Sequence, residues 1–337
     1  MLAGCGVVGG SSSTATPTNT ATAEPTSTPT RTATPKPTET PAATLTPEPA
    51  TSTPEPEAAV PPLAPSAPSQ AAPPAQPAPT GRVLPRGGTI VLRVPKDGAW
   101  GARALFRGDN FPMIDGGDEF WVPVGAGAAA ALGDFTVTYT RYNEDGEAIG
   151  TSSEIVSVTY TEYPVEYITL PPGQLEGFTP EGVQQEINIR ASTFAVFTPQ
   201  KLWSGPFILP IAGVESGGFG DARSFNGGPV GGNHSGEDFA APEGAPIAAA
   251  AAGRVAFAGF LATRGNSVII DHGVGVFTAY HHMSRIDVAQ GQDLAQGQQV
   301  GAVGSTGLST GPHLHWELVV GRVNVDPVMW TFAGVAP

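Results

Sequence analysis

The proline- and threonine-rich tract over residues 11–80 most limits what this chain can fold into. It holds 18 of the 35 prolines and 17 threonines, and it contains no aromatic residue. Such a segment cannot bury enough apolar surface to offset its conformational entropy, and proline biases it toward extended polyproline II. We therefore predict a disordered linker over 11–80, which leaves 257 residues for one large domain or two ordinary ones.

The tract follows the only cysteine, Cys5, which lies in Leu2-Ala3-Gly4-Cys5. This tetrapeptide resembles a bacterial lipobox, in which the cysteine receives a lipid, although a complete signal would include an apolar run before it. We interpret residues 1–10 as the end of a truncated lipobox segment, and the alternative is a chance cysteine. Roughly 70 residues of polyproline II would reach about 200 Å. The tract is then either a semi-rigid stalk or an inert tail.

Composition excludes several classes of protein. The net charge is −14 and only 16 residues are Lys or Arg, so no basic stripe exists to neutralise the phosphates of a nucleic acid. No stretch of 18 apolar residues is present, so no transmembrane helix is predicted. A single cysteine excludes internal disulfides and a cysteine-rich zinc site.

Residues 82–165 have the pattern of a small β-sandwich-like module. Short runs rich in β-branched and aromatic residues predict strands at 89–94, 120–124, 135–142 and 154–160. Asn143–Gly146 is a turn signal that makes the last two strands a hairpin. Pro123 predicts that its strand lies at a sheet edge, because proline donates no ladder hydrogen bond.

This module has no cluster of catalytic residue types. Its aromatic side chains favour core packing, and a glycan-binding platform is the alternative; they are Phe106, Phe111, Trp121 and Tyr139. Residues 166–205 then read as a linker with a helix from Glu181 to Phe197. Thr179 is its expected N-cap, and Pro180 is suited to the first turn.

Histidines concentrate in the last part of the chain. All six lie within the final 104 residues, at positions 234, 272, 281, 282, 313 and 315. An even distribution would produce this arrangement very rarely. The domain predicted over 206–337 therefore uses imidazole for its chemistry.

Two pairs of residues in this domain have the spacing of metal ligands. His234 precedes Asp238 by four residues, after a glycine-rich stretch that favours a loop running into a strand. His313 and His315 flank one residue, so on a strand both imidazoles point to the same side. Two histidines and an aspartate suit zinc, which keeps a fourth position for water in catalytic sites. Each spacing alone is weak, but the combination favours a zinc site.

Longer segments make this assignment specific. In chain order they are His234–Gly244, Ala252–Val255, Gly265–Gly273, Tyr280–Ser284 and Gly304–Glu317. Together they resemble the lysostaphin/LytM-type zinc metalloendopeptidases, which cut peptide bonds in bacterial peptidoglycan. The resemblance covers about residues 206–330. It implies antiparallel sheets around an open groove, the duplicated hybrid motif fold, and some members similarly carry an N-terminal β-rich module.

The resemblance implies a role for each of five residues. His234, Asp238 and His315 match the three zinc ligands of the family. His313 matches the general base that takes a proton from zinc-activated water. His282 matches the histidine that stabilises the oxyanion of the tetrahedral intermediate. All five positions are retained, whereas relatives that only activate other wall hydrolases have lost ligands.

The remaining candidates receive structural roles. On an extended strand His281 faces away from His282, which predicts a structural or surface position. His272 is expected at the boundary between a strand and a turn, hydrogen-bonded to backbone. Glu237 is expected to point into solvent. Ala248–Ala252 is predicted as a strand despite its helix propensity, because its flanks are strand-like.

The sequence thus predicts a mainly β, zinc-dependent metalloendopeptidase, with one Zn²⁺ per catalytic domain and peptidoglycan peptides as substrate. Its expected location is the cell envelope, lipid-anchored through Cys5 or secreted. A glycine bridge and a stem-peptide cross-link involving D-alanine both fit as the bond cleaved. The alternatives are a catalytically silent wall-binding or amidase-activating module and a structural lipoprotein. In a latent enzyme, Asn226 or its loop would occupy the fourth zinc position.

Overall fold

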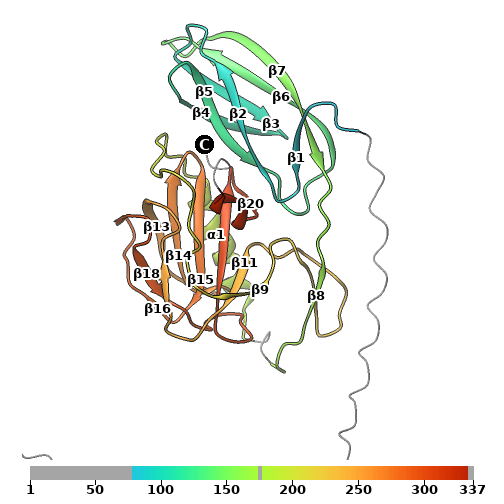
Figure 1. The fold of residues 1–337 in the computed structure, drawn as a ribbon, viewed down its shortest axis with the longest axis vertical. Helices are drawn as coiled ribbons and strands as arrows, with labels where there is room; N and C mark the ends of the chain where they lie inside the picture. Colours follow the sequence, from blue (N-terminus) through green and yellow to red (C-terminus); the bar gives the residue numbers. More distant parts are fainter. Residues whose placement is uncertain (1–77, 174–176, 333–337) are drawn as a thin grey trace, which may run out of the picture. The chain divides into compact units, whose positions relative to one another are not determined.

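The computed structural model describes residues 78–173 and 177–332. These residues form a mainly β structure with one α-helix, as predicted (Figure 1). The lipobox and nearly all of the predicted linker over 11–80 lie outside the described residues. Among the described helices, none is long and apolar enough to cross a membrane.

Seven strands between residues 82 and 159 form one continuous sheet. They are β1 (Arg82–Pro85), β2 (Thr89–Pro95), β3 (Gly101–Phe106), β4 (Asp109–Asp115), β5 (Glu119–Gly125), β6 (Gly133–Tyr142) and β7 (Ala148–Thr159). Their order across the sheet is β1-β7-β6-β3-β4-β5-β2. All four strands predicted here are present. The hairpin of β6 and β7 across Asn143–Gly146 is also confirmed.

This sheet curls back on itself instead of dividing into two separate layers. The edge strands β1 and β2 approach each other, and the Arg82 guanidinium donates a hydrogen bond of 2.8 Å from Nη2 to the Val91 carbonyl. The enclosed side chains include three of the four aromatic residues noted in the sequence, Phe106, Trp121 and Tyr139, which are buried. Core packing is therefore their role.

The edge position predicted for Pro123 is wrong. Its strand β5 lies between β4 and β2, and Pro123 pairs with Val91 of β2. The ladder between β5 and β4 covers only Phe120 and Trp121. The side of the strand next to Pro123 therefore has no ladder on it, which is the condition that proline requires.

The segment between the N-terminal sheet and the histidine-rich region contains β8 (Val165–Ile168) and α1 (Pro180–Phe194). Thr179 caps the helix as predicted, its Oγ1 accepting a hydrogen bond from the Gly182 N–H at 3.1 Å. The helix ends three residues earlier than predicted. Beyond the helix the backbone bonds to the residue after β14 instead: the Val274 N–H donates to the Thr198 carbonyl.

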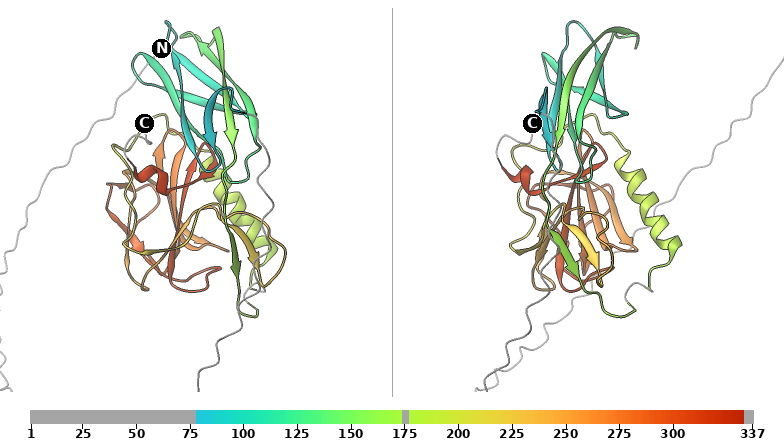
Figure 2. Two further views of the ribbon diagram at one scale, coloured as in Figure 1. Left: turned by 45° about the vertical axis from the view of Figure 1, so that its right-hand side comes forward. Right: turned by 90° about the vertical axis from the view of Figure 1, so that its right-hand side faces the viewer.

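The helix lies against one face of the C-terminal sheet (Figure 2). Phe194 packs edge-to-face on Phe277, with ring centroids 5.4 Å apart. Ile269, Ala279 and Val319 complete this small apolar cluster. The linker helix is therefore part of the packing of the histidine-rich domain.

The remaining strands form a large sheet and two small ones. They are β9 (Val214–Gly217), β10 (Ala222–Phe225), β11 (Glu237–Ala240), β12 (Pro246–Ala248), β13 (Gly253–Leu261), β14 (Gly265–Gly273), β15 (Val276–Met283), β16 (Arg285–Ile286), β17 (Asp293–Leu294), β18 (Gln299–Ala302), β19 (His313–Val320) and β20 (Val323–Val325). The large sheet has the order β17-β13-β14-β15-β19-β11-β9, with β20 on β19. A three-stranded sheet has the order β12-β18-β16, and β10 pairs parallel to β8.

The centre of the large sheet is almost wholly buried. Every residue of β15 and all but the first of β19 are buried, so these strands are covered on both faces. The strand predicted over Ala248–Ala252 is wrong beyond Ala248. Strand β12 ends there, and four residues without strand structure lead to β13; of these four, Ala249, Ala250 and Ala251 are buried in the core.

The apolar core runs from the N-terminal sheet into the C-terminal sheets without a break. The short 3-10 helix η1 (Val328–Thr331) contributes to this junction. Its Trp330 donates a hydrogen bond from Nε1 to the Thr89 hydroxyl at 3.2 Å, and the Asp326 N–H donates to the Gly87 carbonyl. The division into separate domains at 165 and 206 stays a prediction.

Trp330 provides a test of this packing. It is fully buried, with its ring 5.2 Å from that of Phe207 and 6.0 Å from that of Trp203. Trp330→Ala should lower the free energy of unfolding by about 3–5 kcal/mol, because a large cavity would remain. Met329→Ala is the matched control, because Met329 is 44% exposed. Equal unfolding midpoints in denaturant for the two variants would contradict this account.

Candidate active site

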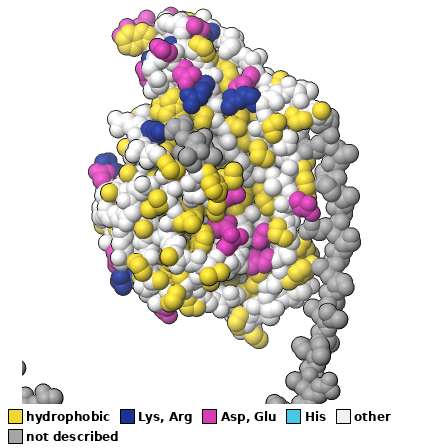
Figure 3. Space-filling view, viewed as in Figure 1, with side chains coloured by type: hydrophobic (Ala, Val, Ile, Leu, Met, Phe, Trp, Pro, Cys, Tyr) yellow, Lys and Arg dark blue, Asp and Glu magenta, His cyan; other side chains and the backbone are white. Residues whose placement is uncertain are grey.

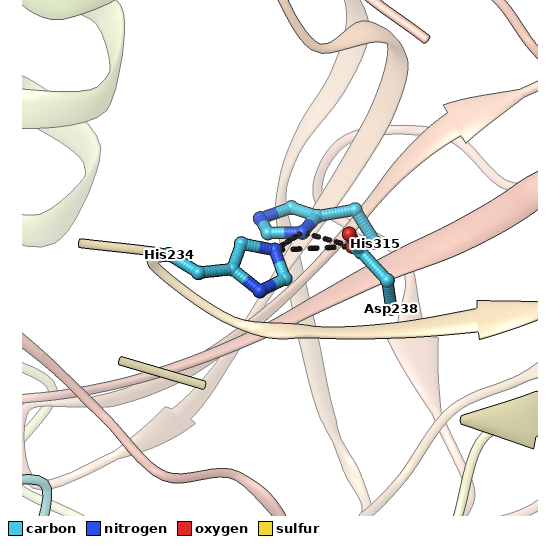
Figure 4. A group of neighbouring side chains, drawn as sticks. All are labelled: His234, Asp238 and His315. Atoms are coloured by element: carbon cyan, nitrogen blue, oxygen red, sulfur yellow. Dashed lines mark hydrogen bonds and ion pairs between the residues drawn. The ribbon is translucent and has the colours of Figure 1, made fainter. Parts of the chain in front are cut away.

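Two adjacent strands bring the predicted metal ligands together. Asp238 lies on β11 and His315 on β19, and the two residues are direct partners in the antiparallel ladder. His234 lies in the loop that leads into β11, after the glycine-rich stretch. In Figure 4 the three side chains point toward one another from these separate segments. Residues 77 positions apart thus meet through strand register.

The donor atoms of these three residues converge on one point. His234 Nε2 lies 2.9 Å from His315 Nδ1 and 3.1 Å from Asp238 Oδ1, and His315 Nδ1 lies 2.7 Å from that oxygen. All three residues are buried, and one ligand atom from each lies within 4.8 Å of the others. Two imidazole nitrogens and one carboxylate oxygen fit zinc, with the fourth position left for water or substrate.

The far nitrogen of each ligand histidine has a hydrogen-bond acceptor. His234 donates from Nδ1 to the Gly218 carbonyl at 2.8 Å, and His315 donates from Nε2 to Glu317 Oε1 at 3.1 Å. In the neutral rings these bonds leave the lone pairs of His234 Nε2 and His315 Nδ1 for a metal. This arrangement fixes the tautomer and orientation of metal-binding histidines.

Charge around Asp238 favours its ionised form. Burial acts to raise the pKa of Asp238, but the neighbouring His315 and His234 lower it more, so the pKa lies well below its usual value. Arg223 donates to the second carboxylate oxygen, Oδ2, at 2.9 Å and also pairs with Glu166 of β8. Asp238 is therefore an ionised ligand at any physiological pH.

The other two predicted site histidines lie beside the triad. His313 donates from Nδ1 to the Gly311 carbonyl at 2.8 Å, which leaves Nε2 as an acceptor 3.9 Å from Asp238 Oδ1. The rings of His282 and His313 are 4.7 Å apart, and those of His282 and His315 are 6.0 Å apart. All five predicted residues border one pocket.

A β-bulge aims His282 into this pocket. Asn266 pairs with Met283 and Val268 with Tyr280, so two residues of β15 face one of β14. The second of the two is His282, whose φ is 59° in the left-handed region. Bulges of this kind redirect side chains next to functional sites, and a non-glycine residue at positive φ is uncommon.

The His282 ring is neutral under ordinary conditions. Burial, together with the nearby His315 and His313, lowers its pKa to about 3. It donates from Nδ1 to the Thr306 carbonyl at 2.7 Å, so Nε2 holds a lone pair. The predicted oxyanion role therefore requires a second proton on the ring.

The pocket extends beyond the five predicted residues. Its walls include Glu166, Ile168 and Leu170 from β8 and the residues that follow it, and Leu308 to Thr310 from the loop before β19. On the face in Figure 3 no histidine of the described residues is visible. The linker strand β8 thus supplies part of the pocket, which the sequence reasoning did not anticipate.

The structure places three further residues named in the sequence analysis. His272 donates from Nδ1 to the Ala252 carbonyl at 2.8 Å near the end of β14, which confirms its structural role. His281 is also structural and is fully buried. Asn226 accepts a hydrogen bond from the Leu170 N–H on its Oδ1 and does not border the pocket, so its proposed metal contact has no support in this conformation.

The prediction that Glu237 points into solvent is wrong. Glu237 is 4% exposed, and its Oε2 accepts a hydrogen bond from the Phe219 N–H at 2.9 Å. Burial raises the pKa of Glu237 to about 8. The turn that follows β9 packs over the Glu237 side chain and covers the side expected to face solvent. Glu237 fastens the loop whose Gly218 carbonyl orients His234.

Sequence reasoning also missed Glu317. It lies two residues after His315 on β19, so its side chain shares the face of the metal ligands. The same period of two that related His313 to His315 extends to Glu317, and this pattern was available in the sequence.

A β-sheet domain that gathers two histidines and an aspartate, with two more histidines beside them, defines a metallohydrolase-type site. Residues 232–327 match Peptidase family M23. The DD-carboxypeptidase/endopeptidase Mpg of Neisseria meningitidis serogroup B is 47% identical over 95 residues, which are 28% of this chain and 22% of that protein. The chain therefore spans about a fifth of that relative.

Two solved structures are also similar to this chain. The catalytic domain of the prophage-encoded M23 protein EnpA from Enterococcus faecalis is 37% identical over 34% of this chain and 89% of that chain, with a TM-score of 0.31. A structure from Pseudomonas aeruginosa assigned to peptidase M23 is 28% identical over 73% of this chain and 94% of that chain, with a TM-score of 0.55. The chain belongs to peptidase family M23 through its C-terminal domain.

Proposed function

We propose that this protein is a zinc-dependent metalloendopeptidase that hydrolyses peptide bonds in bacterial peptidoglycan, and that it works in the cell envelope. The observation that carries the proposal is the convergence of His234, Asp238 and His315 beside His313 and His282 in one pocket. The name of the Neisseria relative, a DD-carboxypeptidase/endopeptidase, favours a stem-peptide cross-link over a glycine bridge as the bond cleaved.

The five residues have different roles in the proposed reaction. A zinc ion held by the triad would supply Lewis acidity, which polarises the scissile carbonyl and lowers the pKa of the attacking water. The unprotonated Nε2 of His313 accepts the proton of that water, and the Gly311 carbonyl holds the ring in the required tautomer. The proton then passes from His313 to the leaving amine.

His282 borders the same pocket from β15, the strand paired with β19. We propose that the developing oxyanion draws a proton from solvent onto Nε2, which then donates to the oxyanion while Nδ1 stays bonded to the Thr306 carbonyl. The ring returns this proton to solvent when the tetrahedral intermediate collapses. The ionised Asp238 nearby favours that proton, and burial opposes it. The bulge in β15 keeps the ring at this position.

His282→Ala should lower kcat by about 10²–10³, the usual cost of losing one oxyanion donor. KM should change little, because the contact forms in the transition state and not in the bound substrate. Steady-state rates on a soluble cross-linked muropeptide would measure both quantities. Thr306 bonds to His282 through its backbone carbonyl and N–H and not through its side chain, so Thr306→Ser is the matched control and should keep kcat near wild type. A rise in KM with kcat unchanged would contradict the oxyanion role.

Digestion of purified peptidoglycan by the zinc-loaded protein tests the function itself. Mass spectrometry of the soluble fragments should reveal new peptide ends at the cross-links between stem peptides. New ends at a glycine bridge instead would support the peptidase activity but show that a different bond is cleaved. Intact peptidoglycan after treatment with folded, zinc-bound protein would overturn the proposal and favour a catalytically silent module. The next measurement would then be whether the protein stimulates an added amidase.

A further inference from the structure

The carboxylate of Glu317 lies directly behind the metal ligands and is completely buried. Its Oε1 accepts hydrogen bonds from His315 Nε2 at 3.1 Å and from the Ser235 hydroxyl at 2.8 Å. His315 therefore has a carboxylate on the nitrogen opposite to the one that faces Asp238. A carboxylate in this position orients a ligand histidine and makes it a stronger donor.

Two arginines neutralise this buried carboxylate from opposite sides. Arg190 donates from Nη2 to Glu317 Oε2 at 2.8 Å, and Arg264 donates from Nη2 to Oε1, also at 2.8 Å. Arg264 is held in turn by Glu186, whose Oε1 lies 2.7 Å from its Nη1. A buried carboxylate without such partners would be strongly destabilised.

Two members of this network come from helix α1. Glu186 and Arg190 lie one turn apart on the helix face that meets the sheet. The helix ends at Phe194, whereas the match to the peptidase family begins only at residue 232. The charged residues behind His315 therefore belong partly to the linker segment.

We propose that helix α1 is a working part of the metal centre, in which Arg190 is a positioning residue that holds Glu317 against His315. Arg190 fixes one carboxylate oxygen, so the other stays on His315 Nε2 and the Nδ1 lone pair stays directed at the metal. Without Arg190 the carboxylate keeps one arginine and rotates toward it, which loosens the ring of His315. The inference rests on the metal site and does not require that the substrate be peptidoglycan.

The test compares substitutions in the full chain by their zinc affinity. Arg190→Gln should weaken zinc binding by about 10–100-fold in chelator competition, the usual effect of removing an outer-shell partner. Arg190→Lys keeps the charge next to Glu317 and should recover most of the loss. Substitution with Co²⁺ adds a spectroscopic readout, because its visible absorption reports the ligand geometry directly.

Two controls separate positioning from packing and from charge. Ile269→Ala removes apolar packing from the cluster that Phe194 and Phe277 form beneath the same helix, so it should lower stability while the folded protein keeps its zinc affinity. Arg254→Gln removes an exposed arginine that pairs with Asp293, with the same change in net charge. Circular dichroism in the presence of chelator measures the folded fraction of each variant.

Weaker zinc binding and a changed Co²⁺ spectrum in Arg190→Gln alone, with recovery in Arg190→Lys, would support the proposal. An unchanged affinity in folded Arg190→Gln, or an equal loss in Ile269→Ala, would overturn it. If Arg190→Gln does not fold, Arg190→Lys and Glu317→Gln carry the test. Unchanged zinc affinity in folded Glu317→Gln would then reject the network. Because no assay here uses peptidoglycan, its outcome is independent of the proposed cleavage.

Discussion

Replacing His313 with alanine is expected to slow peptide cleavage by about 10²–10⁴, the usual contribution of a general base. His313 is not one of the three ligands, and its Nε2 is an acceptor 3.9 Å from Asp238 Oδ1. Its removal leaves the donors of His234, Asp238 and His315 in place. Zinc affinity should therefore stay within a few-fold of wild type.

The measurement pairs rate with metal content. Cleavage of a cross-linked muropeptide is followed by mass spectrometry, and bound zinc is counted in the same sample. His313→Gln is a useful second variant, because it keeps much of the side-chain volume without a basic nitrogen. Cleavage within tenfold of wild type in a zinc-bound variant would show that another group takes the proton.

Loss of one metal ligand should have the largest effect of all. In His315→Ala the zinc site retains two donors, and both zinc binding and cleavage should fall below detection. Zinc should also stabilise the wild-type fold, because it binds the folded chain. At a free concentration 1,000 times Kd the gain is about 4 kcal/mol, which raises Tm by roughly 8–16 °C for a chain of this size.

Thermal melts with and without zinc provide the measurement. The shift should be absent in His315→Ala and present in the Met329→Ala control. An equal zinc-dependent shift in His315→Ala would place the metal elsewhere in the chain.

The shift should also depend on pH. Burial lowers the pKa of His315, but Asp238 and Glu317 raise it more, so the net pKa in zinc-free protein is raised. Protonated His315 therefore stabilises the zinc-free fold at acid pH, and this contribution is lost as the pH rises through the raised pKa. Since zinc must displace that proton, the zinc-dependent rise in Tm should be smallest in acid and grow with pH.

Local sequence patterns predicted where the strands lie in the chain better than which strands pair with each other. Alternation and turn residues located β2, β5, β6 and β7, but they did not reveal that these strands form one curled sheet. Pro123 illustrates the limit, because the rule about proline concerns the absence of a ladder at one residue and not the position of a whole strand. Glu237 is a similar case, since the turn after β9 packs over the side chain that strand alternation would expose.

The sequence by itself pointed to the residues of the candidate site. Spacings typical of metal ligands indicated His234, Asp238, His313 and His315, because few side chains bind zinc, and the resemblance to the lysostaphin/LytM-type peptidases added His282 and a role for each residue. Only the tertiary structure decided how they are supported. The pairing of Asp238 with His315, the bulge under His282 and the reach of Arg190 to Glu317 join positions up to 127 residues apart. Contacts of that range depend on strand register and helix packing, which no local pattern encodes.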